Sequence, residues 1–79
     1  LVAENVESDA EEIQILLQKA IQTLPEKQKL VFTMRYYEDL PYEEISQILD
    51  MSVGTLKTNY HYAKDKVEQY IKDNYSEEF

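Results

Sequence analysis

The chain has 79 residues, 16 of them acidic and 8 basic, for a formal net charge of −8, with one histidine and no cysteine. A chain of this length forms one small domain, and its composition excludes disulfides, thiolate metal sites and a zinc centre built from histidines. These 79 residues contain no apolar run near the roughly 20 residues that cross a bilayer and no signal-peptide pattern, so we expect a soluble, cytoplasmic domain without a cofactor.

The excess acid lies at the two ends of the chain. The first twelve residues carry five acidic side chains and the last seven carry three, whereas all basic residues lie between Lys19 and Lys72. Such charge blocks usually mark solvated tails, although an acidic arm that modulates nucleic-acid binding is an alternative. The chain opens with Leu1 rather than methionine, which favours a fragment of a longer protein. We divide it into an acidic linker or disordered end at 1–8, a folded domain at 9–73 and an acidic tail at 74–79.

A first helix is expected to begin near Asp9. Ser8 and Glu11 have the spacing of a capping box, in which each side chain binds a free backbone N–H of the first turn. Apolar residues then recur at steps of three and four, which places them on one face of a helix. They are Ile13, Leu16, Leu17, Ala20, Ile21 and Leu24.

A second helix is expected to run to about Tyr37. Thr23 and Glu26 repeat the capping-box spacing around a proline, which the first turn of a helix tolerates. Residues 30–37 are apolar over more than one face, which indicates a central helix between two neighbours. The helix must end before Pro41, because the residue before a proline avoids helical backbone angles.

A short third helix is expected from Tyr42 to Leu49, followed by a connection of only three residues. Such a short connection forces a sharp angle between helices, as in a helix-turn-helix. Asp50 tolerates the left-handed conformation that this turn requires, and Ser52 suits the N-cap of the next helix. The inward positions of the third helix are Ile45, Ile48 and Leu49.

The fourth helix is the longest and is expected to reach about Asp73. Its inward stripe is Val53, Leu56, Tyr60, Ala63, Val67, Tyr70 and Ile71. Rotation by 100° per residue places another set on the opposite side: Gly54, Thr55, Thr58, His61, Tyr62 and Asp65. This side begins with small residues, carries groups that hydrogen-bond to bases or phosphates, and is flanked by Lys57 and Lys64. It has the chemistry of a helix that enters a DNA groove.

The pattern alone also fits an ordinary helical bundle. In that interpretation Lys57 and Lys64 are surface lysines, His61 is a surface histidine, and the seven tyrosines are packing residues with one wet end. The sequence has no paired nucleophile and base and no glycine-rich phosphate loop, so we do not expect an enzyme.

The order of motifs resembles a known family over residues 24–67, which read LPEKQKLVFTMRYYEDLPYEEISQILDMSVGTLKTNYHYAKDKV. The leucine-proline-glutamate opening, the Met-Arg-Tyr segment, the Tyr-Glu-Glu-Ile helix start and the Ser-Val-Gly-Thr-Leu-Lys helix start occur in the same order there. The family is the C-terminal promoter-binding domain, region four, of bacterial extracytoplasmic-function sigma factors. The resemblance implies an all-α, small four-helix domain with a helix-turn-helix that binds the minus-thirty-five promoter element.

The resemblance also implies site residues and partners. Gly54, Thr55, Lys57, Thr58, His61 and Tyr62 match the groove-facing part of the motif. Arg35, Tyr42 and Glu43 match positions that touch or support the DNA backbone, Glu43 indirectly through the N-terminus of its helix. The implied partners are promoter DNA, the flap region of the RNA polymerase core and an anti-sigma factor, with no membrane and no catalytic residue.

This chain departs from the family pattern in its arginines. Many relatives read Lys-Ser-Arg and then Arg-Ala, where this chain has Asn59 and Tyr62 in the arginine positions. Because bidentate arginine contacts with guanine are the commonest specific base contacts, we expect a different preferred sequence and weak DNA binding in isolation, with tethering to polymerase supplying affinity. Two alternatives stay open: the output domain of a response regulator, and a docking module for polymerase or an anti-sigma factor.

Overall fold

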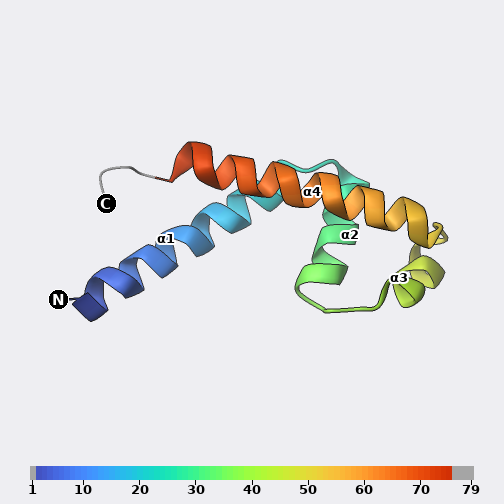
Figure 1. Cartoon of the computed structure of the whole chain (residues 1–79), viewed down its shortest axis with the longest axis horizontal. Coiled ribbons are helices and arrows are strands. Elements are labelled where there is room, and N and C mark those ends of the chain that lie inside the picture. The colour runs from blue at the N-terminus through green and yellow to red at the C-terminus, as the bar shows by residue number, and fades with distance from the viewer. Residues whose placement is uncertain (1, 76–79) are drawn as a thin grey trace.

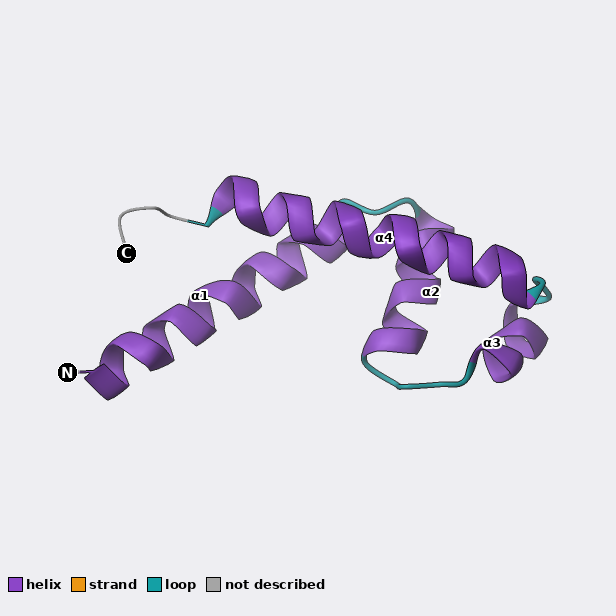
Figure 2. Cartoon of the chain, viewed as in Figure 1, coloured by secondary structure: helices purple, strands orange, loops and turns teal. Residues whose placement is uncertain are grey.

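The computed structural model describes residues 2–75, with side chains from residue 10 onward. This part of the chain is all-α and contains four helices: α1 (Val2–Gln22), α2 (Glu26–Tyr36), α3 (Tyr42–Leu49) and α4 (Val53–Asn74). Figure 2 shows them joined by short loops. The expected fold class and helix order are confirmed, and the bounds of α3 agree with the expectation.

The four helices form an elongated body of 48 × 21 × 16 Å, with α4 along the longest dimension (Figure 1). The C-terminal half of α1 packs against α4, and the N-terminal half of α1 diverges from it. α2 packs against the middle of α4, and α3 packs near its N-terminal end. α4 is therefore the element against which every other helix is placed.

Two clusters of buried side chains hold this arrangement. The first core cluster joins α1, α2 and α4 and contains Leu17, Ala20, Ile21, Leu24, Phe32, Ala63 and Val67. The second core cluster joins α2, α3 and α4 and contains Val31, Ile45 and Leu56. Adjacent residues of α2 thus enter different clusters, which confirms that α2 is a central helix with neighbours on two sides.

The expected start of the first helix near Asp9 is wrong, because α1 begins at Val2. No glycine or proline interrupts residues 2–22, alanine and glutamate favour helix, and acidic residues suit the positive end of a helix dipole. Residues 2–8, assigned above to a linker or disordered end, therefore lie within a helix, and the domain division stays a prediction. Residues 76–79 of the expected acidic tail lie outside the described residues.

The connection between α1 and α2 uses Thr23 differently from the expectation. Its hydroxyl donates to the carbonyl of Ala20 at 2.6 Å, so it closes the end of α1 and does not cap α2. The N-cap of α2 is Pro25, which makes no side-chain cap bond. Because the backbone N–H groups of Thr23 and Leu24 still bond to α1 carbonyls, Thr23 belongs to the end of α1.

Two residues expected to face inward are exposed. Ile13 is 41% exposed and borders an open hollow together with Ile71, Lys72 and Tyr75 near the end of α4, and Ile48 is 53% exposed. On α3, Tyr42 and Leu49 lie to one side of buried Ile45 and Ile48 lies about 60° to the other side, away from the second core cluster. Within residues 2–75, no helix has both the length and the apolar character needed to cross a membrane.

Candidate nucleic-acid interface

The turn between α3 and α4 has the conformation expected of a helix-turn-helix. Asp50 ends α3 in the left-handed region, at φ 56° and ψ 49°, which confirms that aspartate fills this position. The N–H of Met51 bonds to the carbonyl of Ser46 at 3.3 Å, and the Ser46 hydroxyl donates to the carbonyl of Met51 at 2.6 Å. This second bond across the turn was not predicted from the sequence.

The start of α4 is fixed by Ser52, as expected of its N-cap. The Ser52 hydroxyl oxygen accepts from the backbone N–H of Thr55 at 3.1 Å, and the hydroxyl donates to Thr55 Oγ1 at 2.8 Å. Leu56, one turn into the helix, is fully buried in the second core cluster. Together, the cap and the buried leucine set the rotation of α4 about its own axis.

That rotation places a continuous set of exposed residues on one side of α4, which we call the outer face. It consists of Gly54, Thr55, Thr58, His61 and Tyr62. A Cβ added at Gly54 would meet no described atom within 4 Å beyond its chain neighbours and its own helical backbone. The packing of this domain therefore does not require glycine at position 54.

Two contacts modify the outer face one turn further along. His61 Nε2 lies 3.4 Å from Asp65 Oδ2. Asn59 donates from its side-chain nitrogen to the carbonyl of Thr55 at 3.0 Å. Asn59 thus binds its own helix, and the polar groups left pointing outward are mainly those of Thr58, His61 and Tyr62.

A second group of candidate residues meets where α2, α3 and α4 come together. The Arg35 guanidinium lies over the Tyr42 ring at 5.1 Å, and Lys57 Nζ lies 5.8 Å from the centre of the same ring. We call Arg35, Tyr42 and Lys57 the cationic corner. It brings together three candidate residues that are up to 22 positions apart in the sequence. The fourth candidate near it, Glu43, is exposed in the first turn of α3.

The loop before α3 holds Arg35 in the cationic corner. Arg35 Nη1 donates to the carbonyl of Leu40 at 3.2 Å and pairs with Asp39 Oδ1 at 3.2 Å. Asp39 has a positive φ of 53°, so the loop turns back toward the end of α2. These bonds were not predicted from the sequence, because they depend on the loop conformation.

A chain of aromatic rings connects the cationic corner to the domain interior. The Tyr60 ring meets the Tyr42 ring edge-on at 6.4 Å and stacks on Phe32 at 5.6 Å. Phe32 stacks on Tyr36 at 5.1 Å. Burial raises the pKa of the Tyr60 hydroxyl above its usual value of 10.0, with a smaller contribution in the same direction from Tyr42. The helical periodicity predicted only that Tyr60 faces inward.

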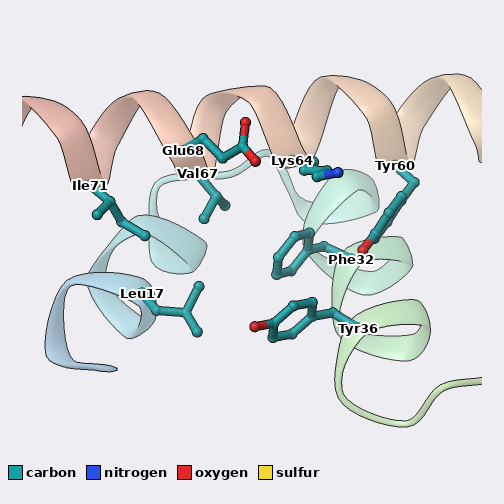
Figure 3. Close-up of a pocket in the computed structure, with 8 residues that line it drawn as sticks. All are labelled: Leu17, Phe32, Tyr36, Tyr60, Lys64, Val67, Glu68 and Ile71. Carbon is teal, nitrogen blue, oxygen red and sulfur yellow. The ribbon is translucent and has the colours of Figure 1, made fainter. Parts of the chain in front are cut away.

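An apolar groove lies on the other side of α4 from the outer face. Its volume is about 160 Å³, and its walls come from α1, α2 and α4 (Figure 3). The residues that line it are Leu17, Phe32, Tyr36, Tyr60, Lys64, Val67, Glu68 and Ile71. Figure 3 shows the Phe32 and Tyr36 rings pointing toward Leu17 across the groove. No sequence signal singled out this groove, because its walls come from three helices.

The part of the chain with described side chains contains no group of three or more His, Asp or Glu residues arranged to hold a metal ion.

Comparison with known proteins identifies a family and several relatives. Residues 14–67 match the family described as Sigma-70, region 4. The ECF RNA polymerase sigma factor SigW of Bacillus subtilis is 32% identical over 62 residues, which cover 78% of this chain and 33% of that protein. The ECF RNA polymerase sigma-E factors of Escherichia coli K12 and Salmonella typhimurium LT2 are each 30% identical over 63 residues, which cover 80% of this chain. The match spans about a third of the length of these relatives.

Proposed function

The chain belongs to the Sigma-70 region 4 family, and on this premise we propose that it recognises the minus-thirty-five promoter element as part of an extracytoplasmic-function sigma factor. In that role it helps RNA polymerase start transcription at selected promoters, in the cytoplasm. The observation that carries the proposal is the outer face of α4, an exposed and polar surface on the second helix of a helix-turn-helix. A helix of this kind fits the major groove with its N-terminal residues against the base edges.

Gly54 supports a close approach of DNA to the start of α4. A glycine inside a helix costs about 0.5–1 kcal/mol of stability relative to alanine. No described side chain needs the space beside Gly54, so the packing of the domain does not account for this cost. A DNA surface close to the helix does account for it, because a side chain at this position would stand between the two.

The two groups of candidate residues have different roles in this proposal. Thr58, His61 and Tyr62 point outward from α4 and contact base edges, which gives sequence preference. Arg35, Tyr42 and Lys57 contact phosphates, which gives affinity and register. Glu43 supports the backbone contact through the N-terminus of α3.

The missing arginines make the isolated domain a weak DNA binder. Of the outer-face side chains, His61 is paired with Asp65 and none carries a guanidinium group. The attachment of the domain to RNA polymerase then supplies the missing affinity, because a tethered domain meets its site at a high effective concentration. The polymerase core, through its flap region, and an anti-sigma factor are the protein partners in this account.

The apolar groove supports a second candidate function, a docking module for polymerase or an anti-sigma factor. Its walls include Tyr36, which is 52% exposed, and it lies on the opposite side of α4 from the outer face. Exposed aromatic side chains beside a groove are typical of protein contacts. The two functions are compatible, since each uses a different side of α4. The family match favours both over the output domain of a response regulator.

The test is a selection of DNA duplexes from a randomised pool by the full-length sigma factor bound to polymerase. We expect enrichment of a defined upstream element, with binding that weakens as salt rises because phosphate contacts release counterions. Polymerase core without sigma factor is the control. Enrichment of no upstream element, or binding that does not respond to salt, would contradict the proposed function.

A further inference from the structure

Tyr60 packs against both core clusters of the domain. Among the described residues, it is the one partly buried side chain that packs against the first and the second core cluster alike. It also lines the apolar groove, where Figure 3 shows its ring directed from α4 toward Phe32. Tyr60 therefore lies where the contacts of α1, α2, α3 and α4 converge.

The Tyr60 ring is held firmly on one side. It stacks on Phe32 at 5.6 Å with an angle of 20° between the rings, and Phe32 is almost completely buried. A ring against a buried partner has little room to rotate, because protein interiors are closely packed. Tyr60 can therefore act as a fixed support for a neighbour on its other side.

That neighbour is Tyr42, which, like Tyr60, packs against the second core cluster. Tyr42 is the first residue of α3, is only partly buried, and meets the edge of the Tyr60 ring at 6.4 Å and 76°. Its other ring contacts are with the two cations of the cationic corner. Tyr60 is thus the aromatic support that fixes where the Tyr42 ring stands.

The position of the Tyr42 ring in turn determines where the two cations stand. A cation within about 6 Å of a ring centre is attracted by the negative face of the ring, and both Arg35 and Lys57 meet this limit. Both cations lie beside one ring, so an anion that approaches the ring is attracted by both of them. Asp39, which pairs with Arg35 at 3.2 Å, offsets part of this charge, and Lys57 supplies the rest. A DNA phosphate is such an anion.

We propose that Tyr60 is a positioning residue of the DNA site, which fixes the Tyr42 ring and through it holds Arg35 and Lys57 ready to bind the phosphate backbone. The proposal rests on the proposed function for the identity of the anion. Tyr60 itself does not touch DNA, since its ring lies between Tyr42 and Phe32. The hydroxyl group is not needed for this role, whereas the ring is.

The first experiment measures the salt dependence of binding to a short fluorescein-labelled duplex of mixed sequence, by anisotropy at low salt with the 79-residue chain. The slope of log K against log salt is negative, and each lost phosphate contact makes it shallower by about 0.9. We expect Tyr60→Leu to make the slope shallower by the equivalent of one to two phosphate contacts. The double variant Arg35→Ala, Lys57→Ala is expected to cause the same change. Tyr60→Phe, which keeps the ring, retains the wild-type slope.

Tyr70→Leu is the matched control for packing. Tyr70 lies on the same helix and packs, partly buried, against the first core cluster, but it has no ring contact with Tyr42 among the described residues. It is expected to lower stability while leaving the slope unchanged. Tyr60→Met, which fills similar space with a flexible side chain, replaces Tyr60→Leu if that variant does not fold. A wild-type slope in both Tyr60→Leu and Tyr60→Met would overturn the proposal.

A second measurement separates this proposal from the proposed function. Proton NMR of the free chain reports ring-current shifts of the Arg35 Hε proton and the Lys57 side-chain protons, without any DNA. We expect these signals to move toward random-coil positions in Tyr60→Leu and to stay in Tyr60→Phe and Tyr70→Leu. If the full-length sigma factor bound to polymerase shows no salt-dependent DNA binding, the proposed function fails. Unmoved Arg35 and Lys57 signals in Tyr60→Leu overturn the positioning role in either case.

Discussion

The outer face of α4 and the cationic corner are built in different ways. The outer face is carried by one helix, and its side-chain contacts among the described residues, such as Ser52 to Thr55 and His61 to Asp65, stay within that helix or its cap. The cationic corner takes Arg35 from α2, Tyr42 from α3 and Lys57 from α4. Substitutions on the outer face should therefore change recognition without changing the fold, whereas the corner depends on how three helices pack.

This difference suits the two tasks assigned to them. Sequence preference can change when single exposed side chains change, because base contacts are local. Phosphate contacts must keep the same register on every promoter, and a site tied to the packing of three helices keeps that register. Substitutions in each region test whether the two are as independent as their construction indicates.

The largest expected effect comes from a residue on which both regions depend. Leu56→Ala removes a fully buried side chain from the second core cluster, which anchors α4 against α2 and α3. Such a substitution costs about 2–5 kcal/mol of unfolding free energy. Chemical denaturation followed by circular dichroism measures this cost. A loss below 1 kcal/mol would mean that the rotation of α4 is set by other contacts.

The next largest effect is expected from a substitution that places an arginine on the outer face. Tyr62→Arg adds a bidentate donor at an exposed position, so we expect tighter DNA binding and a new preference for guanine. Each good bidentate contact is worth about 1–3 kcal/mol of discrimination. Anisotropy titration of matched duplexes that differ at one base pair measures it. An affinity equal to wild type would show that residue 62 does not reach the bases.

Ser52→Ala removes the N-cap of α4 and tests whether the outer face needs an ordered first turn. We expect a loss of about 1 kcal/mol in unfolding free energy, because the N–H of Thr55 loses its side-chain acceptor. Thermal unfolding measures the loss, and Ser52→Asp, which keeps an acceptor, is the control. Equal loss in both variants would count against the capping role.

Gly54→Ala is expected to cause the smallest change in stability. It should raise the free energy of unfolding but lower the affinity for DNA. Because the added Cβ meets no described side chain and Gly54 lies in the first turn of α4, we expect a gain in unfolding free energy of at most about 0.5–1 kcal/mol, the value for a glycine in the middle of a helix. Affinity for the selected promoter duplex should fall, since the methyl group stands where DNA approaches. A gain in stability with unchanged affinity would remove the argument from Gly54 for close approach.

The sequence predicted those features that depend on neighbours along the chain. Spacing and cap residues indicated α3, the left-handed Asp50, the Ser52 cap and the outward direction of Thr58 and His61, because each is decided within one helix or one turn. The same kind of reasoning failed at the start of α1, which begins at Val2 and not near Asp9, because no glycine or proline interrupts the helix before Asp9.

Features that depend on packing between helices could not be predicted from spacing. The bond from Ser46 to Met51, the gathering of Arg35 and Lys57 on one ring, and the support from Tyr60 all require a particular angle between helices. Periodicity reports which side of a helix is buried but not which residue of another helix it meets. The apolar groove escaped prediction for the same reason.

The most direct test of the central claim compares the DNA sequences selected by two forms of the same holoenzyme. One carries the wild-type domain, and the other carries Thr58→Ala and His61→Ala on the outer face. The account predicts that the substituted form loses the preferred upstream element but keeps salt-dependent binding to duplexes of mixed sequence, because the cationic corner is intact. Enrichment of the same upstream element by both forms would contradict the claim that the outer face of α4 reads the promoter.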